Sequence, residues 1–431
     1  MRRIAWVLVV LTGLVAALAA LVYGLNVRGE EALPSGEERA VAGPGSAEQL
    51  ARGQYLARVG DCMACHTVPG GTPYAGGRGI ETPFGLVYAP NLTPDAATGL
   101  GGWSAAEFWR AMHNGRSRDG RLLYPAFPYD AYTRVRREDS DAIFAYLQSL
   151  PPVTQPRRAH ALRFPYNTQA ALAVWRALFF TPGVQVEEAQ QSAQWNLGAY
   201  LVQGLGHCAS CHSPRNALGA TSEARAFSGG LIPVQHWYAP ALNRADEAGV
   251  AHWSEGDVVA LLRTGVNSHA GVSGPMAEVV FRSTQYLSDA DARAMAAYLR
   301  ALLPQAPPPR RAEGGGVSAS AMARGAEVYG QHCVQCHGER GEGQVDAFPA
   351  LAGNRAVMLA DPTNVVRLVL QGGYLPATAG HPRPHGMPPM QQVLSDDDVA
   401  AIATFIRNSW GNKAAGVGTM EVYRARERRA P

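Results

Sequence analysis

All six cysteines of this 431-residue chain lie in three copies of one five-residue pattern, Cys-x-x-Cys-His. The copies run from Cys62 to His66, from Cys208 to His212 and from Cys333 to His337. No cysteine is left outside them. At this composition one copy would arise by chance in roughly two to three of a thousand such chains. Three copies that use every cysteine are therefore not a chance event.

The pattern predicts a covalently attached c-type haem at each copy. Two cysteines separated by two residues on a helical turn can both form thioether bonds to one porphyrin edge, and the histidine that follows can ligate the iron. We therefore expect three haems c. The attaching residues would be Cys62, Cys65, Cys208, Cys211, Cys333 and Cys336, and the iron ligands would be His66, His212 and His337.

Other uses of a Cys-x-x-Cys pair fit less well. Zinc sites usually combine two such pairs and do not need a histidine after each second cysteine. A thioredoxin-like redox pair would sit in a βαβ unit, which the sequence pattern lacks. A plain disulfide leaves the histidines unexplained.

A longer unit repeats around each pentad. Each unit opens with a short helical pattern and closes with acidic residues followed by an apolar helix. The openings are residues 52–56, 197–201 and 324–329, and the closing helices are 138–147, 288–299 and 395–406. Ser288 and Ser395 are predicted N-caps, followed by acids that the helix dipole favours. Little of the chain alternates with period two, so we expect a mainly α fold.

The first two units resemble each other more than the third. Both contain a Tyr-Ala-Pro turn, at residues 88–90 and 238–240. Both then have a Trp-Ser pair that predicts a helix start, at residues 103–104 and 253–254.

The sixth iron ligand is expected on the loop before each closing helix. Methionine there gives a six-coordinate electron-transfer haem. In the second unit this residue is Met276, and in the third it is Met387, with Met390 interpreted as a packing residue.

The first unit departs from this pattern. Phe127 follows His66 by 61 residues, and Met276 follows His212 by 64, so Phe127 occupies the ligand position and cannot bind iron. Alignment of the two units places Met112 in the core and His113 on the outer face of its helix. Our hypothesis is that the first haem is five-coordinate or is ligated by a residue that swings in.

The N-terminus predicts export. Arg2 and Arg3 precede an uncharged apolar run of 22 residues from Ile4 to Leu25, which as a helix spans about 33 Å, enough to cross a bilayer core. The positive-inside rule puts the rest of the chain on the periplasmic side. A signal peptide cleaved after Ala19 and a retained anchor are both possible interpretations. The run continues six residues past Ala19, which favours the anchor.

These observations define seven predicted segments. They are a signal or anchor helix (1–30), a first haem domain (45–150), a linker with a helix (151–190), a second haem domain (191–303), a flexible linker (304–321), a third haem domain (322–411) and a loose basic tail (412–431). The net charge is only +3, and no Lys/Arg block indicates nucleic-acid binding.

The ordered motifs resemble the three-haem cytochrome c subunit of membrane-bound alcohol, gluconate and aldehyde dehydrogenases. The matching segments are the pentads with their openings, Tyr88 to Pro94, Tyr124 to Tyr129, Gly274 to Val280 and Asn408 to Asn412. The resemblance implies three tandem class I cytochrome c-like domains. It also implies that a separate dehydrogenase subunit (quinoprotein, flavoprotein or molybdenum type) supplies electrons and that membrane ubiquinone or another acceptor takes them. Many members of that family have methionine where this chain has Phe127.

We therefore expect an electron-transfer subunit rather than an enzyme, because no flavin, pterin or quinone-cofactor motif is present. Two alternatives stay open. One is a peroxidase-like haem enzyme or gas-ligand binder at an open first haem. The other is the cytochrome c subunit of a terminal oxidase.

Overall fold

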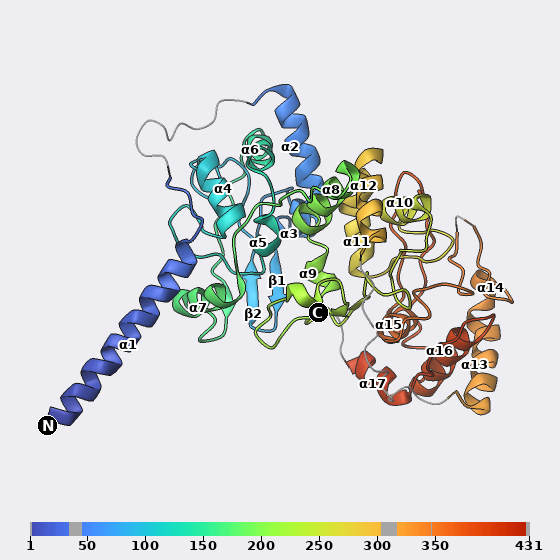
Figure 1. The fold of residues 1–431 in the computed structure, drawn as a ribbon. Helices are drawn as coiled ribbons and strands as arrows, with labels where there is room; N and C mark the ends of the chain where they lie inside the picture. Colours follow the sequence, from blue (N-terminus) through green and yellow to red (C-terminus); the bar gives the residue numbers. More distant parts are fainter. Residues whose placement is uncertain (1, 34–44, 303–316, 346, 428–431) are drawn as a thin grey trace. The chain divides into compact units, whose positions relative to one another are not determined.

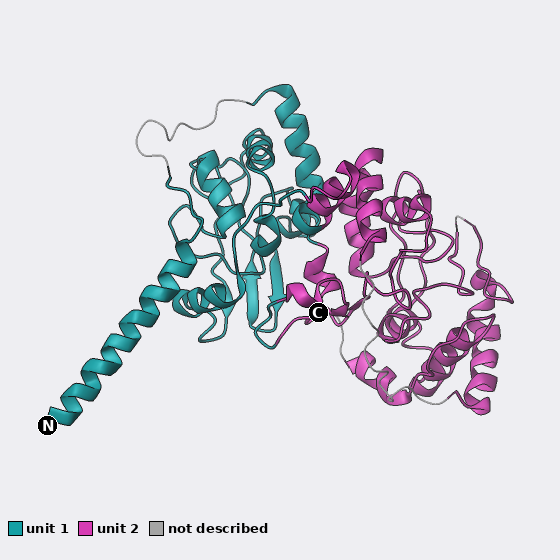
Figure 2. Ribbon diagram, in the orientation of Figure 1, with its two compact units in different colours: residues 1–187, 203–207, 217–220 teal, residues 188–202, 208–216, 221–431 magenta. Residues whose placement is uncertain are grey.

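The computed structural model describes residues 2–33, 45–302, 317–345 and 347–427. They form two compact units, coloured separately in Figure 2. Unit 1 comprises residues 1–187 with 203–207 and 217–220, and unit 2 comprises 188–202, 208–216 and 221–431.

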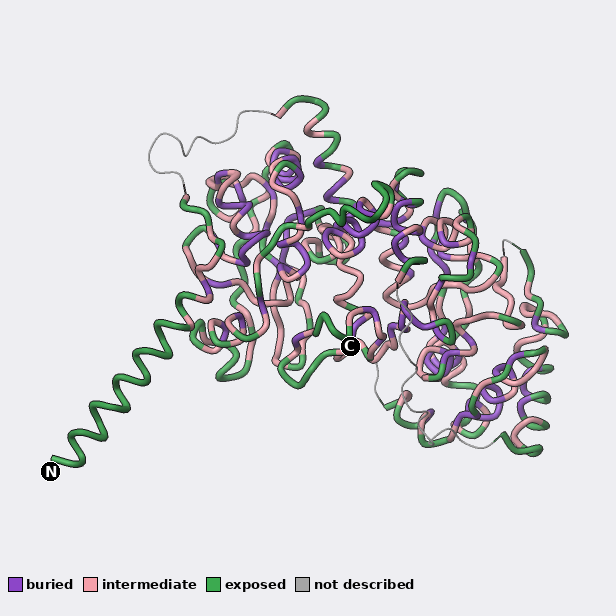
Figure 3. The backbone as a smooth tube through the Cα atoms, viewed as in Figure 1, coloured by how far each residue is buried: buried purple, intermediate pink, exposed green. Residues whose placement is uncertain are grey.

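Unit 1 begins with a long apolar helix, α1 (Arg2–Val27). An 18-residue window within it has a mean hydropathy of 2.6, and none of that window is buried by the rest of the chain. Figure 3 shows the helix exposed along its length until its last turns. Among the described residues it is the one helix long and apolar enough to cross a membrane.

The rest of unit 1 is a helical domain with a small sheet. Its elements are α2 (Ala47–Val59), α3 (Cys62–Cys65), β1 (Gly79–Thr82), β2 (Gly85–Tyr88), α4 (Ala105–Asn114), α5 (Tyr129–Tyr132), α6 (Arg137–Gln148), β3 (Ala161–Leu162) and α7 (Gln169–Phe179). The three strands pair antiparallel in the order β1-β2-β3.

Unit 2 contains two further helical domains. The first has α8 (Ala193–Tyr200), which continues into η2 (Leu201–Leu205), whose last three residues are grouped with unit 1. It then has α9 (Ala209–His212), η3 (Glu223–Arg225), β4 (Gly230–Leu231), β5 (Tyr238–Ala239), α10 (Glu255–Thr264), α11 (Pro275–Arg282), η4 (Thr284–Tyr286) and α12 (Asp289–Arg300). The second has α13 (Ala319–His332), α14 (Val334–His337), α15 (Thr363–Gln371), α16 (Asp396–Asn408) and α17 (Thr419–Glu427).

One helix crossing recurs in all three domains. The opening helix packs on the closing helix at a glycine: Gly53 of α2 on α6, Gly198 of α8 on α12 and Gly325 of α13 on α16. A Cβ atom would lie 1.9 Å from a carbonyl oxygen of the facing helix at Gly53 and Gly198, and 2.4 Å from one at Gly325. Only glycine allows the two backbones to approach this closely. The repeat seen in the sequence is therefore a repeat of one tertiary contact.

The predicted helix starts are confirmed. The hydroxyls of Ser288 and Ser395 accept hydrogen bonds from the third residue of α12 and α16, as N-caps do. Ser104 and Ser254, from the two Trp-Ser pairs, cap α4 and α10 in the same way.

The C-terminal tail is not loose as predicted. It contains α17, whose Val422 is fully buried and whose Arg426 lies 2.6 Å from the carboxylate of Asp396. Tertiary contacts rather than local propensity therefore order this segment. Of the predicted flexible linker, residues 304–316 lie outside the described residues, and residues 319–321 already belong to α13.

Candidate haem sites

Each pentad folds into one short helical turn. These turns are α3, α9 and α14. In each of them the histidine N–H donates to the carbonyl oxygen of the first cysteine, 3.0 Å away, at His66 on Cys62, His212 on Cys208 and His337 on Cys333. One helical turn therefore brings the two cysteines and the histidine of each pentad close together, as attachment of one haem requires.

The three histidine rings are oriented by the same kind of partner. In each, Nδ1 lies within hydrogen-bond distance of a proline carbonyl oxygen: 2.8 Å for His66 on Pro90, 2.7 Å for His212 on Pro240 and 3.0 Å for His337 on Pro349. A carbonyl oxygen only accepts, so Nδ1 carries the proton. Nε2 then keeps its lone pair, as an iron ligand must.

Burial keeps these rings neutral. It lowers the pKa of His66, His212 and His337 below the ordinary value, because the charged imidazolium loses its hydration. Burial also raises the pKa of the Cys62 and Cys208 thiols to about 12. A neutral histidine with a free Nε2 beside two thiols fits covalent haem c.

The other chemistries considered for these cysteines find no support in the described residues. All six cysteines lie there, and none is in a disulfide. Nowhere in those ranges do three or more His, Cys, Asp or Glu side chains gather as a metal site would require. A zinc site built from protein ligands alone is therefore not formed by them.

Met387 lies on the loop before its closing helix, as predicted. The predicted loop position of Met276 is wrong, because Met276 lies in a short helix, α11, that precedes the closing helix α12. Met276 is the second residue of α11, after Gly274, whose φ of +54° is in the left-handed region. A Cβ atom on Gly274 would lie 2.6 Å from the Trp237 ring, so this turn requires glycine. Met387 pairs with Gly373 through two backbone hydrogen bonds of 2.7 and 3.1 Å. Met387 and Met390 both pack against the core of the third domain.

Phe127 lies among aromatic residues in unit 1. It is half-buried, and its ring centroid is 5.3 Å from that of Tyr132 and 6.5 Å from that of Tyr129. Met112 is buried in the core as predicted, at 4% exposure. The prediction that His113 faces outward is wrong. His113 is buried because its Nδ1 lies 2.8 Å from the carbonyl oxygen of Thr133 and its ring stacks on a neighbouring tryptophan.

Sequence reasoning missed the proline carbonyls and the hydrogen bonds that two arginines donate to the pentads. Arg215 donates to the carbonyl oxygen of Ser210, between the two cysteines of the second pentad, at 2.7 Å. Arg78 donates to the equivalent carbonyl oxygen of Ala64 in the first pentad. The repeated Tyr-Ala-Pro turn was an available signal for two of the three histidine partners, Pro90 and Pro240.

All three pentads lie in segments that match one known protein family. The cytochrome c family profile matches three stretches of the chain, residues 50–151, 196–303 and 322–410, and each contains one pentad. This chain is a member of the cytochrome c family. Membership implies covalently bound haem c with iron, in agreement with the geometry of the pentads. The predicted fold, mainly α with cytochrome c domains after an N-terminal apolar helix, is confirmed.

Curated relatives of this cytochrome extend the comparison over most of its length. The cytochrome c subunit of a quinone-dependent alcohol dehydrogenase from Gluconacetobacter polyoxogenes is 38% identical over 403 residues, covering 88% of this chain and 84% of the relative. The cytochrome c subunit of gluconate 2-dehydrogenase from Pantoea cypripedii is 38% identical, with 85% and 87% covered. A nicotinate dehydrogenase subunit from Pseudomonas putida is 42% identical over 91% of this chain but only 33% of its own length. The predicted resemblance to cytochrome subunits of dehydrogenases is thus confirmed.

Proposed function

We propose that this cytochrome carries three haems c and conducts electrons from a separate dehydrogenase subunit to an acceptor at the membrane. The observation that carries the proposal is the repetition of one site three times, each with its histidine Nδ1 bonded to a proline carbonyl. The relatives named as dehydrogenase cytochrome subunits support the role.

In this proposal the protein residues attach and orient each haem. The six pentad cysteines would form the thioether bonds, and the Nε2 atoms of His66, His212 and His337 would ligate iron. When bound, the haems supply one-electron oxidation and reduction at iron. The proline carbonyls hold each ring in the ligating tautomer.

The three sites are also proposed to differ in the sixth ligand of their iron. Met276 and Met387 are proposed as sixth ligands of the second and third haems. Phe127 leaves the first haem five-coordinate or ligated by a residue that swings in. The optical and magnetic spectra of the oxidised protein test this, because three low-spin Met/His haems would contradict it. Phe127→Met should add one Met/His signal, whereas Met112→Leu, in the core of the same domain, should add none.

The electron donor is proposed to be a dehydrogenase chain of the quinoprotein, flavoprotein or molybdenum type. The names of the relatives do not select one type, because they include alcohol, gluconate and nicotinate dehydrogenases. The acceptor is proposed to be ubiquinone or another membrane oxidant. Unit 1 holds both α1 and the first pentad, so the first haem belongs to the part of the chain that α1 would tether to the periplasmic face of the inner membrane.

Purification of the full-length protein with its natural partner tests the role. Adding the partner's substrate anaerobically should reduce the haems, and adding a short-chain ubiquinone should reoxidise them. If a co-purified dehydrogenase turns over while the haems stay oxidised, the proposed route is wrong.

One observation favours a second candidate function. Phe127 stands where a methionine would close the first haem, and an open iron can bind small ligands. Carbon monoxide should then shift the spectrum of the reduced first haem. Rapid peroxide turnover by the protein without any partner would favour a haem enzyme over an electron conduit.

A further inference from the structure

Helix α7 buries its one charged side chain together with Leu172, and turns other apolar side chains outward. Its single charged residue, Arg176, is only 2% exposed. Val174 and Leu178, one turn apart, are 48% and 65% exposed, and Phe164 in the preceding loop is 81% exposed. A helix on a water-facing surface usually exposes its charged side chains rather than large apolar ones. The outer face of α7 therefore indicates an apolar neighbour.

Contacts between α7 and α1 show where α7 lies relative to the bilayer that α1 would cross. The Asn26 side chain, at the end of α1, donates to the carbonyl oxygen of Ala173 in α7 at 2.9 Å. In return, Nε of Arg176 donates to Oδ1 of Asn26, also at 2.9 Å. Figure 1 shows α7 beside the C-terminal end of α1. Because the apolar run ends at Leu25, α7 lies at the level where α1 would leave the bilayer.

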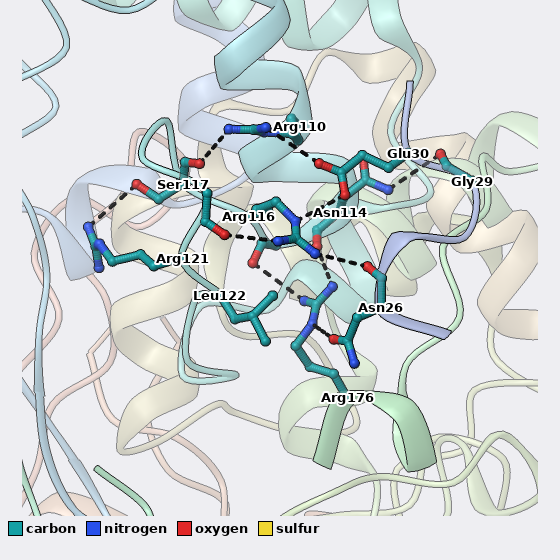
Figure 4. A network of polar contacts seen from close by, with 12 residues as sticks. Asn26, Gly29, Glu30, Arg110, Asn114, Arg116, Ser117, Arg121, Leu122 and Arg176 are labelled. Carbon is teal, nitrogen blue, oxygen red and sulfur yellow. Dashed lines mark hydrogen bonds and ion pairs between the residues drawn. The ribbon is translucent and has the colours of Figure 1, made fainter. Parts of the chain in front are cut away.

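A polar network holds the two helices in this arrangement. Nη2 of Arg176 donates to the carbonyl oxygen of Asn114 at 2.7 Å, and Nη2 of Arg116 donates to that of Asn26 at 3.3 Å. Arg116 also lies 3.0 Å from the carboxylate of Glu30, just past α1. Figure 4 shows these side chains converging on the end of α1. The domain therefore has a defined orientation relative to α1 rather than a flexible tether.

We propose that Val174, Leu178 and Phe164 form a second membrane contact, inserted at the boundary between headgroups and acyl chains of the bilayer that α1 crosses. This inference rests on the proposed anchoring by α1. Arg163, which is exposed beside Phe164, supplies positive charge for anionic headgroups, as amphipathic interfacial segments do. The second contact fixes the tilt of the first haem domain on the membrane surface.

Spin labels on full-length, haem-loaded protein test the proposal. Because the native cysteines would be haem-linked, an added cysteine is the one free thiol. Labels are placed by Leu178→Cys on α7, Leu14→Cys within α1 and, as the water-exposed control, Gln54→Cys on α2, which Figure 1 shows away from α7. The protein is reconstituted into phosphatidylcholine–phosphatidylglycerol vesicles. Collision rates are then measured with oxygen, which partitions into lipid, and with a water-soluble nickel chelate.

We expect the ratio of the oxygen collision rate to the nickel-chelate collision rate to be high for the Leu178 label, as for the Leu14 label. This ratio should be several-fold above that of the Gln54 label. A water-like ratio at Leu178 with a lipid-like ratio at Leu14 overturns the second contact and leaves the anchor intact. A water-like ratio at both positions overturns the anchor as well. A Leu178 label shielded from both reagents means that protein covers this face, which also overturns the proposal.

Discussion

Gly198→Ala is the substitution whose effect the structure specifies most closely. Gly198 lies where α8 crosses α12, and an added Cβ would sit 1.9 Å from the Ala294 carbonyl oxygen and 2.8 Å from Cβ of Tyr298. Real Cβ atoms essentially never approach within 3.0 Å. Because the nearest atoms are backbone, no side-chain rotation relieves the overlap. The two helices must separate by about 1 Å.

The expected cost follows from two opposing effects. Overpacking of a core contact costs about 1–3 kcal/mol, and a rigid backbone neighbour puts this site at the upper end. Alanine also stabilises a helix by about 1 kcal/mol relative to glycine. We therefore expect the free energy of unfolding of the second domain to fall by about 2 kcal/mol, which lowers its Tm by about 10 °C.

Calorimetry of the full-length haem-loaded protein measures this change. The matched control is Gly256→Ala in α10 of the same domain, where the nearest atom to the new Cβ is Oγ of Ser254 at 3.8 Å. The control should keep or slightly raise the Tm. Equal Tm values for wild type, Gly198→Ala and Gly256→Ala would refute the reasoning that the glycine permits the crossing.

Three further predictions concern ligation, anchoring and pH. Met387→Leu should remove the Met/His signal of one haem and lower its reduction potential, whereas Met390→Leu should leave both unchanged in a spectroelectrochemical titration. Arg176→Met should lower the free energy of unfolding of unit 1 by about 3 kcal/mol, because the buried side-chain oxygen of Asn26 and the buried carbonyl oxygen of Asn114 lose their Arg176 donor; urea unfolding measures the change, and an unchanged midpoint would contradict the role of the network. Burial, with nearby arginines, lowers the pKa of His160 to about 4. As the pH falls from about 6.5 to 4, His160 takes up a proton in the unfolded chain but not in the folded chain. The free energy of unfolding should therefore fall over that range. His160→Gln can still accept a hydrogen bond from the Tyr88 N–H, and it should reduce this loss of stability at low pH. Unfolding measured across the pH range tests this, and identical pH profiles of wild type and variant would contradict the role of His160.

Features carried by local sequence were predictable. The pentads, the capping serines and the closing helices depend on residues within a few positions of one another. Comparison of one unit with the next also led to Met276 and Met387 as candidate sixth ligands, and their ligand role stays a prediction.

Features that depend on tertiary contacts were not predictable. The proline carbonyls that orient the three histidines lie 24, 28 and 12 residues downstream, so no constant spacing revealed them. His113 was assigned to an outer face from the alignment of the first two units. That assignment failed because its partner, the carbonyl oxygen of Thr133, lies outside its own helix.

Tertiary contacts also explain two helices outside the repeated units, α17 and α7. Helix α17 has a polar sequence and is ordered by the burial of Val422 and by the ion pair of Arg426. In α7 the charged Arg176 is buried beside Leu172, and its hydrogen-bond partners on α1 and α4 explain why a charged residue is buried there.

The central claim is that one chain carries three covalent haems. The mass of the denatured full-length protein tests it most directly, because thioether-linked haem survives denaturation while ligation does not. The account predicts the polypeptide mass plus three haems, falling by one haem in each variant whose two pentad cysteines are replaced by alanine. A wild-type mass with fewer than three haems would contradict it.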